Sequence, residues 1–278
     1  MGRLMPTIPT RLWREPLVTL GALAHGLAHH PQVLWAPARH VLIVSHMRSN
    51  TTVLSYILGS HPQIAGAAEI HQRYRGPLDL AKLRCRLLRK HRAKRSAGYF
   101  LDKLLHDRYE IADELLQRED VLVLFLLRRP EQTLRSIIAM GRGEGEPAWY
   151  REPERVADYY EARLSFMVRC AERMHQLGAQ RRASLLTAES FLAQPETTLD
   201  HLTRALGLSQ PLSQGYEVFD FTGRIGAGDR SPKIQAGKIV REATDYSAIA
   251  LDDAVLARTQ RAHADALASL SCHVHAIV

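Results

Sequence analysis

The chain has 278 residues, of which 46% are hydrophobic and 24% are charged. This composition is ordinary for a globular protein and excludes disorder over most of the chain, while the length allows one large domain or two small ones. The formal net charge of +8 favours an anionic partner, such as a nucleotide, an acidic glycan, a nucleic acid or a membrane surface, without choosing among them.

The cysteines and the N-terminal segment bear on the compartment. Cys85, Cys170 and Cys272 are far apart, so we expect neither a disulfide framework nor a zinc site, and a reducing cytoplasm fits best. Residues 1–40 contain an apolar stretch at 17–27, which is much shorter than the ~20 residues that span a bilayer and lacks a convincing cleavage site. We expect a helical addition there. Frequent alanine and arginine point to a bacterial source.

Short apolar runs alternate with helical patterns along the chain. The runs, which suit strands buried on both faces of a parallel sheet, are residues 41–44, 121–127 and the weaker 184–186. The helical patterns occupy residues 52–58, 154–177 and 195–206. This order predicts an α/β fold, a three-layer sandwich with a mainly parallel central sheet. We expect a single domain over residues 1–278, with a core at 41–240 and a C-terminal helical tail at 241–278.

A polar loop follows the first predicted strand. It contains Arg48, Ser49, Asn50, Thr51 and Thr52. In a parallel sheet such a loop lies at the carboxyl edge, where ligands usually bind. The free backbone N–H groups at the start of the next helix, together with the arginine and the hydroxyl groups, favour a phosphate or a sulfate. The plainer alternative is that these polar residues only cap the helix.

A second basic motif follows the predicted strand 121–127. Arg128 and Arg129 come at the strand end, Pro130 can open a helix, and Ser136 follows inside that helix. A strand-end arginine and a helix serine can converge on one phosphate, the arginine through its forked N–H donors. The alternative is an exposed basic strand end without a ligand.

Two features of magnesium-dependent P-loop NTPases are missing from the sequence. The loop pattern GxxxxGK[ST] does not occur, and no acidic residue follows the strand 121–127 as a magnesium ligand would. The residues that hold Mg²⁺ and the terminal phosphates in those enzymes therefore have no counterpart here.

The first motif resembles a loop of PAPS-dependent sulfotransferases, in particular the bacterial carbohydrate and tyrosylprotein branch. Those enzymes carry [KR]-S-G-T-T where they grip the 5′-phosphosulfate of PAPS, and this chain has Arg48-Ser49-Asn50-Thr51-Thr52. Asn50 replaces the usual glycine, and asparagine tolerates left-handed backbone angles better than most residues. The resemblance implies that this loop binds the donor.

The second motif is similar to the pattern R-D-P-x-x-x-x-x-S, with which the same family binds the 3′-phosphate of PAPS. Arg128, Pro130 and Ser136 match it, and Arg129 replaces the commoner aspartate. Together the two motifs imply a P-loop-kinase-like fold, PAPS as the sulfuryl donor, PAP as the product and no metal. The acceptor is expected to be a hydroxyl group, of a carbohydrate or a glycolipid.

The resemblance also implies a set of catalytic residues. A base should take the acceptor proton, because sulfuryl transfer resembles phosphoryl transfer. Glu69 takes the place of the family's glutamate base, and His71 is the second candidate. Arg48 would stabilise the leaving oxygens, and Lys103 resembles a lysine that precedes the second motif. A late loop that covers the donor is loosely matched by Arg224, Gly226 and Gly228.

A basic run occupies residues 82–95 and contains no acidic residue. It could attract an anionic glycan, a glycolipid or a membrane surface, or form a solvated basic helix. Nucleic acid is not expected, because no aromatic residues are interleaved. Two alternatives to a sulfotransferase stay open at this point: a P-loop-like small-molecule kinase, and a non-enzymatic basic protein that binds an anionic polymer or a membrane.

Overall fold

A computed structural model describes residue 21 and residues 37–90, 94, 97–106, 109–223, 231–242 and 244–277. Most of the expected helical addition at 1–40 therefore lies outside the described residues. The strands are β1 (Arg39–Ser45), β2 (Ile64–Ala65), β3 (Tyr99–Leu104), β4 (Val121–Leu127), β5 (Ala183–Thr187) and β6 (His275–Ala276). The helices are α3 (Thr51–Ser60), α4 (Pro77–Lys90), α5 (Asp113–Leu116), α6 (Pro130–Gly141), α7 (Pro153–Gln176), α8 (Ala188–Ala193), α9 (Pro195–Leu206) and α10 (Asp253–His273).

The six strands form one sheet in the order β2-β3-β1-β4-β5-β6. Every neighbouring pair is parallel, and β1 lies between β3 and β4. The prediction of an α/β fold with a parallel central sheet is confirmed. The three apolar runs found in the sequence are β1, β4 and β5, which are adjacent in the sheet. They are apolar throughout because strands in the middle of the sheet are covered on both faces.

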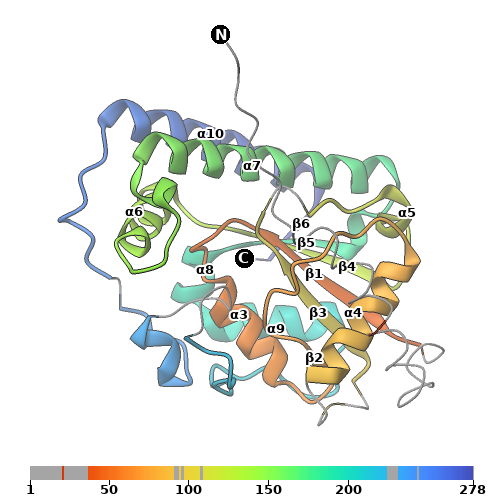
Figure 1. Cartoon of the computed structure of the whole chain (residues 1–278). Coiled ribbons are helices and arrows are strands. Elements are labelled where there is room, and N and C mark those ends of the chain that lie inside the picture. The colour runs from red at the N-terminus through yellow and green to blue at the C-terminus, as the bar shows by residue number, and fades with distance from the viewer. Residues whose placement is uncertain are drawn as a thin grey trace.

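Helices cover both faces of this sheet (Figure 1). Along β1 the side chains alternate, as strand geometry requires. Val41 and Ile43 pack with residues of α3, α8 and α9, whereas Leu42 and Val44 face the side of α4, α5, α6, α7 and α10. Figure 1 shows α7 and α10 running side by side on the latter face. The result is the expected three-layer sandwich. None of the described helices is long and apolar enough to cross a membrane.

Three strands of the sheet were not predicted from the sequence: β3 and the two-residue strands β2 and β6 at its edges. Strand β3 contains Asp102 and Lys103, which interrupt its apolar pattern although both are buried. The segment expected as a helical tail does contain α10, but the chain then adds β6, which pairs with β5. A two-residue edge strand is too short to leave a pattern in the sequence.

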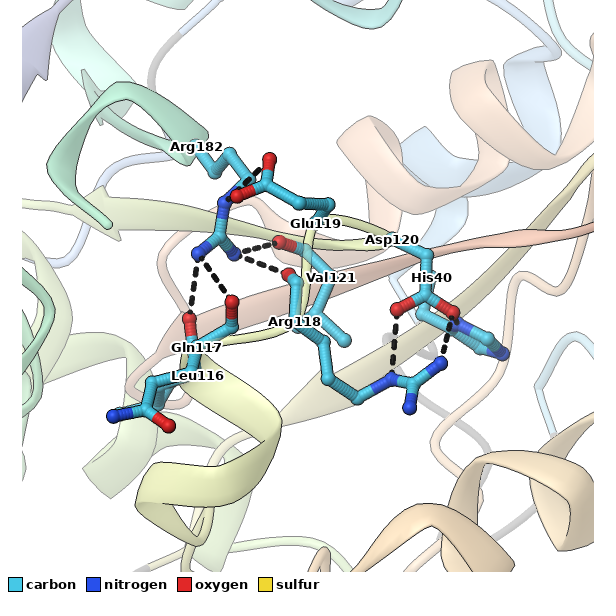
Figure 2. Close-up of polar contacts among 8 residues, drawn as sticks. All are labelled: His40, Leu116, Gln117, Arg118, Glu119, Asp120, Val121 and Arg182. Atoms are coloured by element: carbon cyan, nitrogen blue, oxygen red, sulfur yellow. Dashed lines mark hydrogen bonds and ion pairs between the residues drawn. The ribbon is translucent and has the colours of Figure 1, made fainter. Parts of the chain in front are cut away.

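Arginine side chains hold the turn that precedes β4 and join it to the start of β5 (Figure 2). Arg182 donates hydrogen bonds to the carbonyl oxygens of residues 116, 117, 118 and 121, which form the turn between α5 and β4. Arg118 forms two hydrogen bonds with the Asp120 carboxylate at 2.7 and 2.9 Å. That carboxylate also lies 3.7 Å from the buried ring of His40. These contacts fix the turn from which β4 starts.

Candidate functional site

The loop between β1 and α3 lies at the carboxyl edge of the sheet. Arg48 and Asn50 have positive φ angles of 62° and 66°, which few residues other than glycine adopt without strain. Asn50 is the residue that precedes the first turn of α3. The asparagine that replaces the family's glycine therefore occupies the left-handed conformation that this loop needs. The turn directs Arg48 into the site and leaves Thr51 and Thr52 at the start of the helix.

The hydroxyl groups of two buried serines stabilise this loop through hydrogen bonds. Ser45 Oγ donates to the carbonyl oxygen of Leu126 on β4 and lies 2.7 Å from Ser49 Oγ. Ser49 Oγ also donates to the carbonyl oxygen of His46 at 2.8 Å. Ser49, a predicted donor ligand, is fully buried and contributes to the shape of the loop, so its contact with a ligand stays a prediction.

His46 joins the loop to the end of β4, and the sequence analysis missed it. The Arg128 N–H group donates to His46 Nε2 at 3.1 Å, so the proton of the neutral ring is on Nδ1, 2.9 Å from the Met47 carbonyl oxygen. Burial lowers the pKa of His46 to about 3. The ring therefore stays neutral, which suits a position beside two arginines.

A buried arginine of α7 fixes the same edge of the sheet. Arg163 Nε donates to the Ser45 carbonyl oxygen at 3.0 Å, and its NH2 group donates to the Leu104 carbonyl oxygen at 2.8 Å. These carbonyl groups end β1 and β3, which are neighbours. Because the side chain is fully buried, its N–H groups need such acceptors, and they hold the two strand ends at a set spacing.

The two sequence motifs meet at this edge. Arg48 Nε donates a hydrogen bond to Ser136 Oγ at 2.8 Å, and the Arg128 NH1 group donates to the Arg48 carbonyl oxygen at 2.8 Å. Ser136 lies on α6 and is 1% exposed. Arg48 of the first motif thus contacts both Arg128 and Ser136 of the second, and the convergence of Arg128 and Ser136 on one phosphate stays a prediction.

A cavity of about 140 Å³ opens beside these residues. Of the predicted site residues, its lining includes Arg48, Asn50, Thr51, Thr52, Glu69, His71 and Arg128. The other lining residues are Met47, Val53, Leu105, His106, Met140, Glu146 and Tyr150. The fold therefore places the proposed cationic residues and the proposed bases around one space, although they come from three separate stretches of the chain.

Glu69 and His71 lie close together on the wall of this cavity. Glu69 Oε2 is 3.5 Å from His71 Nδ1, and the Glu69 side chain is 9% exposed. The segment is fixed by Asp102, whose carboxylate accepts the Ile70 N–H group at 2.8 Å and the Tyr74 hydroxyl at 2.6 Å. Burial raises the pKa of Asp102 to about 6. Asp102 therefore positions the segment that carries both candidate bases.

The remaining predicted residues are placed differently. Lys103 is buried on β3 in register with Ile43, which puts its side chain on the α3 face, and it does not line the cavity. Arg224, Gly226 and Gly228 lie outside the described residues. The basic run 82–95 begins on α4, and its residues 91–93 and 95 also lie outside them. Elsewhere, the described chain holds no group of three histidine, cysteine or acidic residues arranged for a metal ion.

Solved structures share this arrangement of strands and helices. A sulfotransferase domain from the curacin biosynthetic pathway is 15% identical, matches 83% of this chain and 97% of its own, and has a TM-score of 0.55. The chain has the sulfotransferase fold. A sulfotransferase from Alicyclobacillus acidocaldarius is 18% identical over 87% of this chain and 98% of its own, with a TM-score of 0.51. The sequence matches no protein-family model and no curated protein.

Within the sulfotransferase fold, the site has two chemically distinct parts. One part is cationic and includes Arg48, Arg128 and the start of α3, which together can bind phosphate or sulfate oxygens. The other part carries the Glu69 carboxylate and the His71 imidazole, either of which can accept a proton. Such a pairing of anion-binding groups with a nearby base suits the transfer of an anionic group to a hydroxyl.

Proposed function

We propose that this protein is a PAPS-dependent sulfotransferase that moves a sulfuryl group to a hydroxyl group of a carbohydrate or glycolipid acceptor. The observation that carries the proposal is the hydrogen bond between Arg48 and Ser136. It brings together two motifs that the family uses for the two phosphate-bearing ends of one donor. A protein that bound a single anion, or an extended polymer, would not need both.

The cationic part of the site fits the donor. Arg48 and Arg128 line the cavity, and guanidinium groups suit phosphate oxygens because their N–H donors form a planar fork. The first turn of α3 adds backbone N–H groups, with Thr51 and Thr52 at its start. Arg48 and Thr52 would hold the 5′ side of PAPS, and Arg128 and Ser136 the 3′-phosphate.

The catalytic step requires one proton acceptor. When bound, PAPS supplies the sulfuryl group, whose bond to the 5′-phosphate oxygen breaks as a bond to the acceptor oxygen forms. Glu69 takes the acceptor's proton, and His71, 3.5 Å from it, keeps its carboxylate oriented. Arg48 offsets the negative charge that grows on the leaving phosphate oxygens. The late loop with Arg224, Gly226 and Gly228 is proposed as a further part of the donor site, whereas Lys103 does not line the cavity.

The acceptor side of the cavity suits a sugar. Tyr150 lines it and packs edge-on against Trp149, with ring centroids 4.5 Å apart. Binding sites commonly combine such apolar and aromatic walls with a few polar groups that fix orientation, and Glu69, His71 and Glu146 supply the polar groups here. The basic helix α4 would add affinity for an anionic glycan or a membrane surface. The proposed location is the cytoplasm.

The proposal is tested with radiolabelled PAPS and a panel of neutral, amino and acidic glycans and glycolipids. We expect label to move to at least one hydroxyl-bearing acceptor without added metal, and Arg48→Ala to lower that rate by about 10²–10³-fold, as loss of a charge-stabilising donor does. Arg155→Ala is the matched control, because Arg155 is exposed on α7 and pairs with Glu152. Label transfer that needs ATP and Mg²⁺, or none in folded protein, would contradict the proposal.

A further inference from the structure

Tyr246 reaches the anion-binding residues from a part of the chain that neither motif includes. It lies in the segment before α10, and its hydroxyl oxygen is 3.0 Å from Ser136 Oγ. Ser136 Oγ also accepts the hydrogen bond from Arg48 Nε at 2.8 Å. Tyr246, Ser136 and Arg48 therefore form one hydrogen-bonded group, with a contribution from the C-terminal part of the chain.

The phenol oxygen of Tyr246 lies in a positive electrostatic field. Burial raises the pKa of Tyr246, but the hydrogen bond with Ser136, the charge of Arg48 and hydrogen bonds with Arg48 and Thr244 together outweigh burial, so the pKa lies below its ordinary value. The charge that stabilises negative charge on a phenol oxygen would equally stabilise a phosphate oxygen beside it. The position is therefore suited to an anionic ligand.

The backbone holds Tyr246 in place. The Ile249 N–H group donates to the Tyr246 carbonyl oxygen at 2.9 Å, and Ile249 is buried in the core formed by α6, α7 and α10. The Tyr246 ring packs against the same core. A ligand contact from such an anchored side chain needs little ordering on binding, which favours affinity.

We infer that Tyr246 is a further donor-binding residue, whose hydroxyl group donates a hydrogen bond to the 3′-phosphate held by Ser136 and Arg128. Ser136 accepts from Arg48, so its own hydrogen can go to the Tyr246 oxygen, which leaves the phenol hydrogen for a phosphate oxygen. The inference rests on the proposed PAPS site. It adds to that site a residue from the segment that precedes α10.

The test compares two nucleotides by titration calorimetry. PAP carries the 3′-phosphate and adenosine 5′-monophosphate lacks it, so the ratio of their affinities isolates this phosphate. We expect Tyr246→Phe to weaken PAP binding about tenfold, as loss of one hydrogen bond to a charged group does, and to change binding of the monophosphate less than about twofold. Phenylalanine keeps the ring packing, and thermal unfolding verifies the fold.

Tyr99→Phe is the matched control, because its hydroxyl donates to the Leu206 carbonyl oxygen on the other face of the sheet, and both nucleotides should bind it as they bind the wild type. Equal losses of both nucleotides in Tyr246→Phe, or no loss of PAP affinity, would overturn the inference while leaving the proposed function intact. A wild-type protein that binds no PAP would remove the proposed function and the inference together.

Discussion

The two ends of β1 and β4 both carry arginines, but their surroundings differ. At the amino ends, Arg118 is bound by a carboxylate and Arg182 by four backbone carbonyl groups of one turn (Figure 2). At the carboxyl ends, Arg48 and Arg128 face a cavity and contact a hydroxyl and a carbonyl oxygen. Positive charge enclosed by its own turn supports the fold, whereas positive charge beside a cavity can bind an anionic ligand.

The same contrast holds for the two histidines of this region. His40 and His46 are both buried, and burial lowers the pKa of each. The His46 ring bonds to two backbone groups of the site. Among the described contacts, neither His40 ring nitrogen has a hydrogen-bond partner, and the Asp120 carboxylate is 3.7 Å away. The carboxyl end thus carries the left-handed backbone of Arg48 and Asn50 and the groups that face the cavity, whereas the contacts of the amino end lie within the turn before β4.

The largest expected effect is on the rate of sulfuryl transfer, and it should distinguish Glu69 at the carboxyl end of the sheet from Glu119 at the amino end. Glu69→Gln should lower the rate of sulfuryl transfer by about 10²–10⁴-fold, because the amide cannot accept the acceptor's proton. Glu119→Gln is the control: Glu119 is 94% exposed near Arg182 at the amino end, and we expect it to transfer at the wild-type rate. Initial rates with saturating PAPS make the comparison. A Glu69→Gln enzyme of normal rate would leave His71 as the candidate base.

The next largest effect is on the stability of the fold and concerns Arg182, at the amino end of the sheet. Arg182→Met should lower the free energy of unfolding by about 2–3 kcal/mol, because it removes four charged hydrogen bonds to carbonyl groups of the turn, two of them partly buried, while keeping most of the side-chain volume. Urea denaturation measures it. The folded variant should bind PAP as tightly as the wild type. If PAP affinity fell while stability did not, the division of roles between the two ends would be wrong.

The smallest effect is a pH dependence shared by both ends. The unfolded histidines titrate near pH 6.5, and in the folded state both pKa values are lower. The stability from each neutral ring is therefore present above about pH 6.5 and is lost as the pH falls toward the folded pKa, by up to about 1.4 kcal/mol per pH unit for each. His40→Gln and His46→Gln should each flatten this slope between pH 7 and 5.

Affinity for PAP distinguishes these two variants. His46→Gln should also weaken PAP binding, since the ring joins Met47 to Arg128, whereas His40→Gln should not. Urea denaturation at several pH values, with a PAP titration at pH 7, covers both readouts. An unchanged slope in both variants would mean that neither ring folds in its neutral form.

The elements that could be predicted from the sequence are those whose structure is determined by a local pattern of residues. Strands β1 and β4 follow from uninterrupted apolar runs, and Asn50 is compatible with the left-handed turn it adopts. Strand β3 could not be predicted in this way, because Asp102 and Lys103 interrupt its apolar pattern. Asp102 is buried there because its carboxylate accepts hydrogen bonds from Ile70 and Tyr74. Such partners are separated by about thirty residues and are visible only once the chain has folded.

The site was predictable to the extent that short motifs carry it. Arg48 and Ser136 belong to motifs, and the structure brings them into contact. His46 and Tyr246 belong to no pattern, because their importance comes from hydrogen bonds to residues 82 and 110 positions away. A histidine directly after the strand-end serine was the one local signal for His46, and Tyr246 left none.

The most direct test of the account is titration of the wild-type protein and Arg128→Ala with PAP, without metal and beside ADP. We expect the wild type to bind PAP with a dissociation constant of about 1 μM or tighter, ADP to bind far more weakly, and Arg128→Ala to lose most of the PAP affinity. Folded wild-type protein that binds no PAP, or that binds ADP as tightly, would contradict the assignment of the carboxyl end of the sheet as a PAPS site.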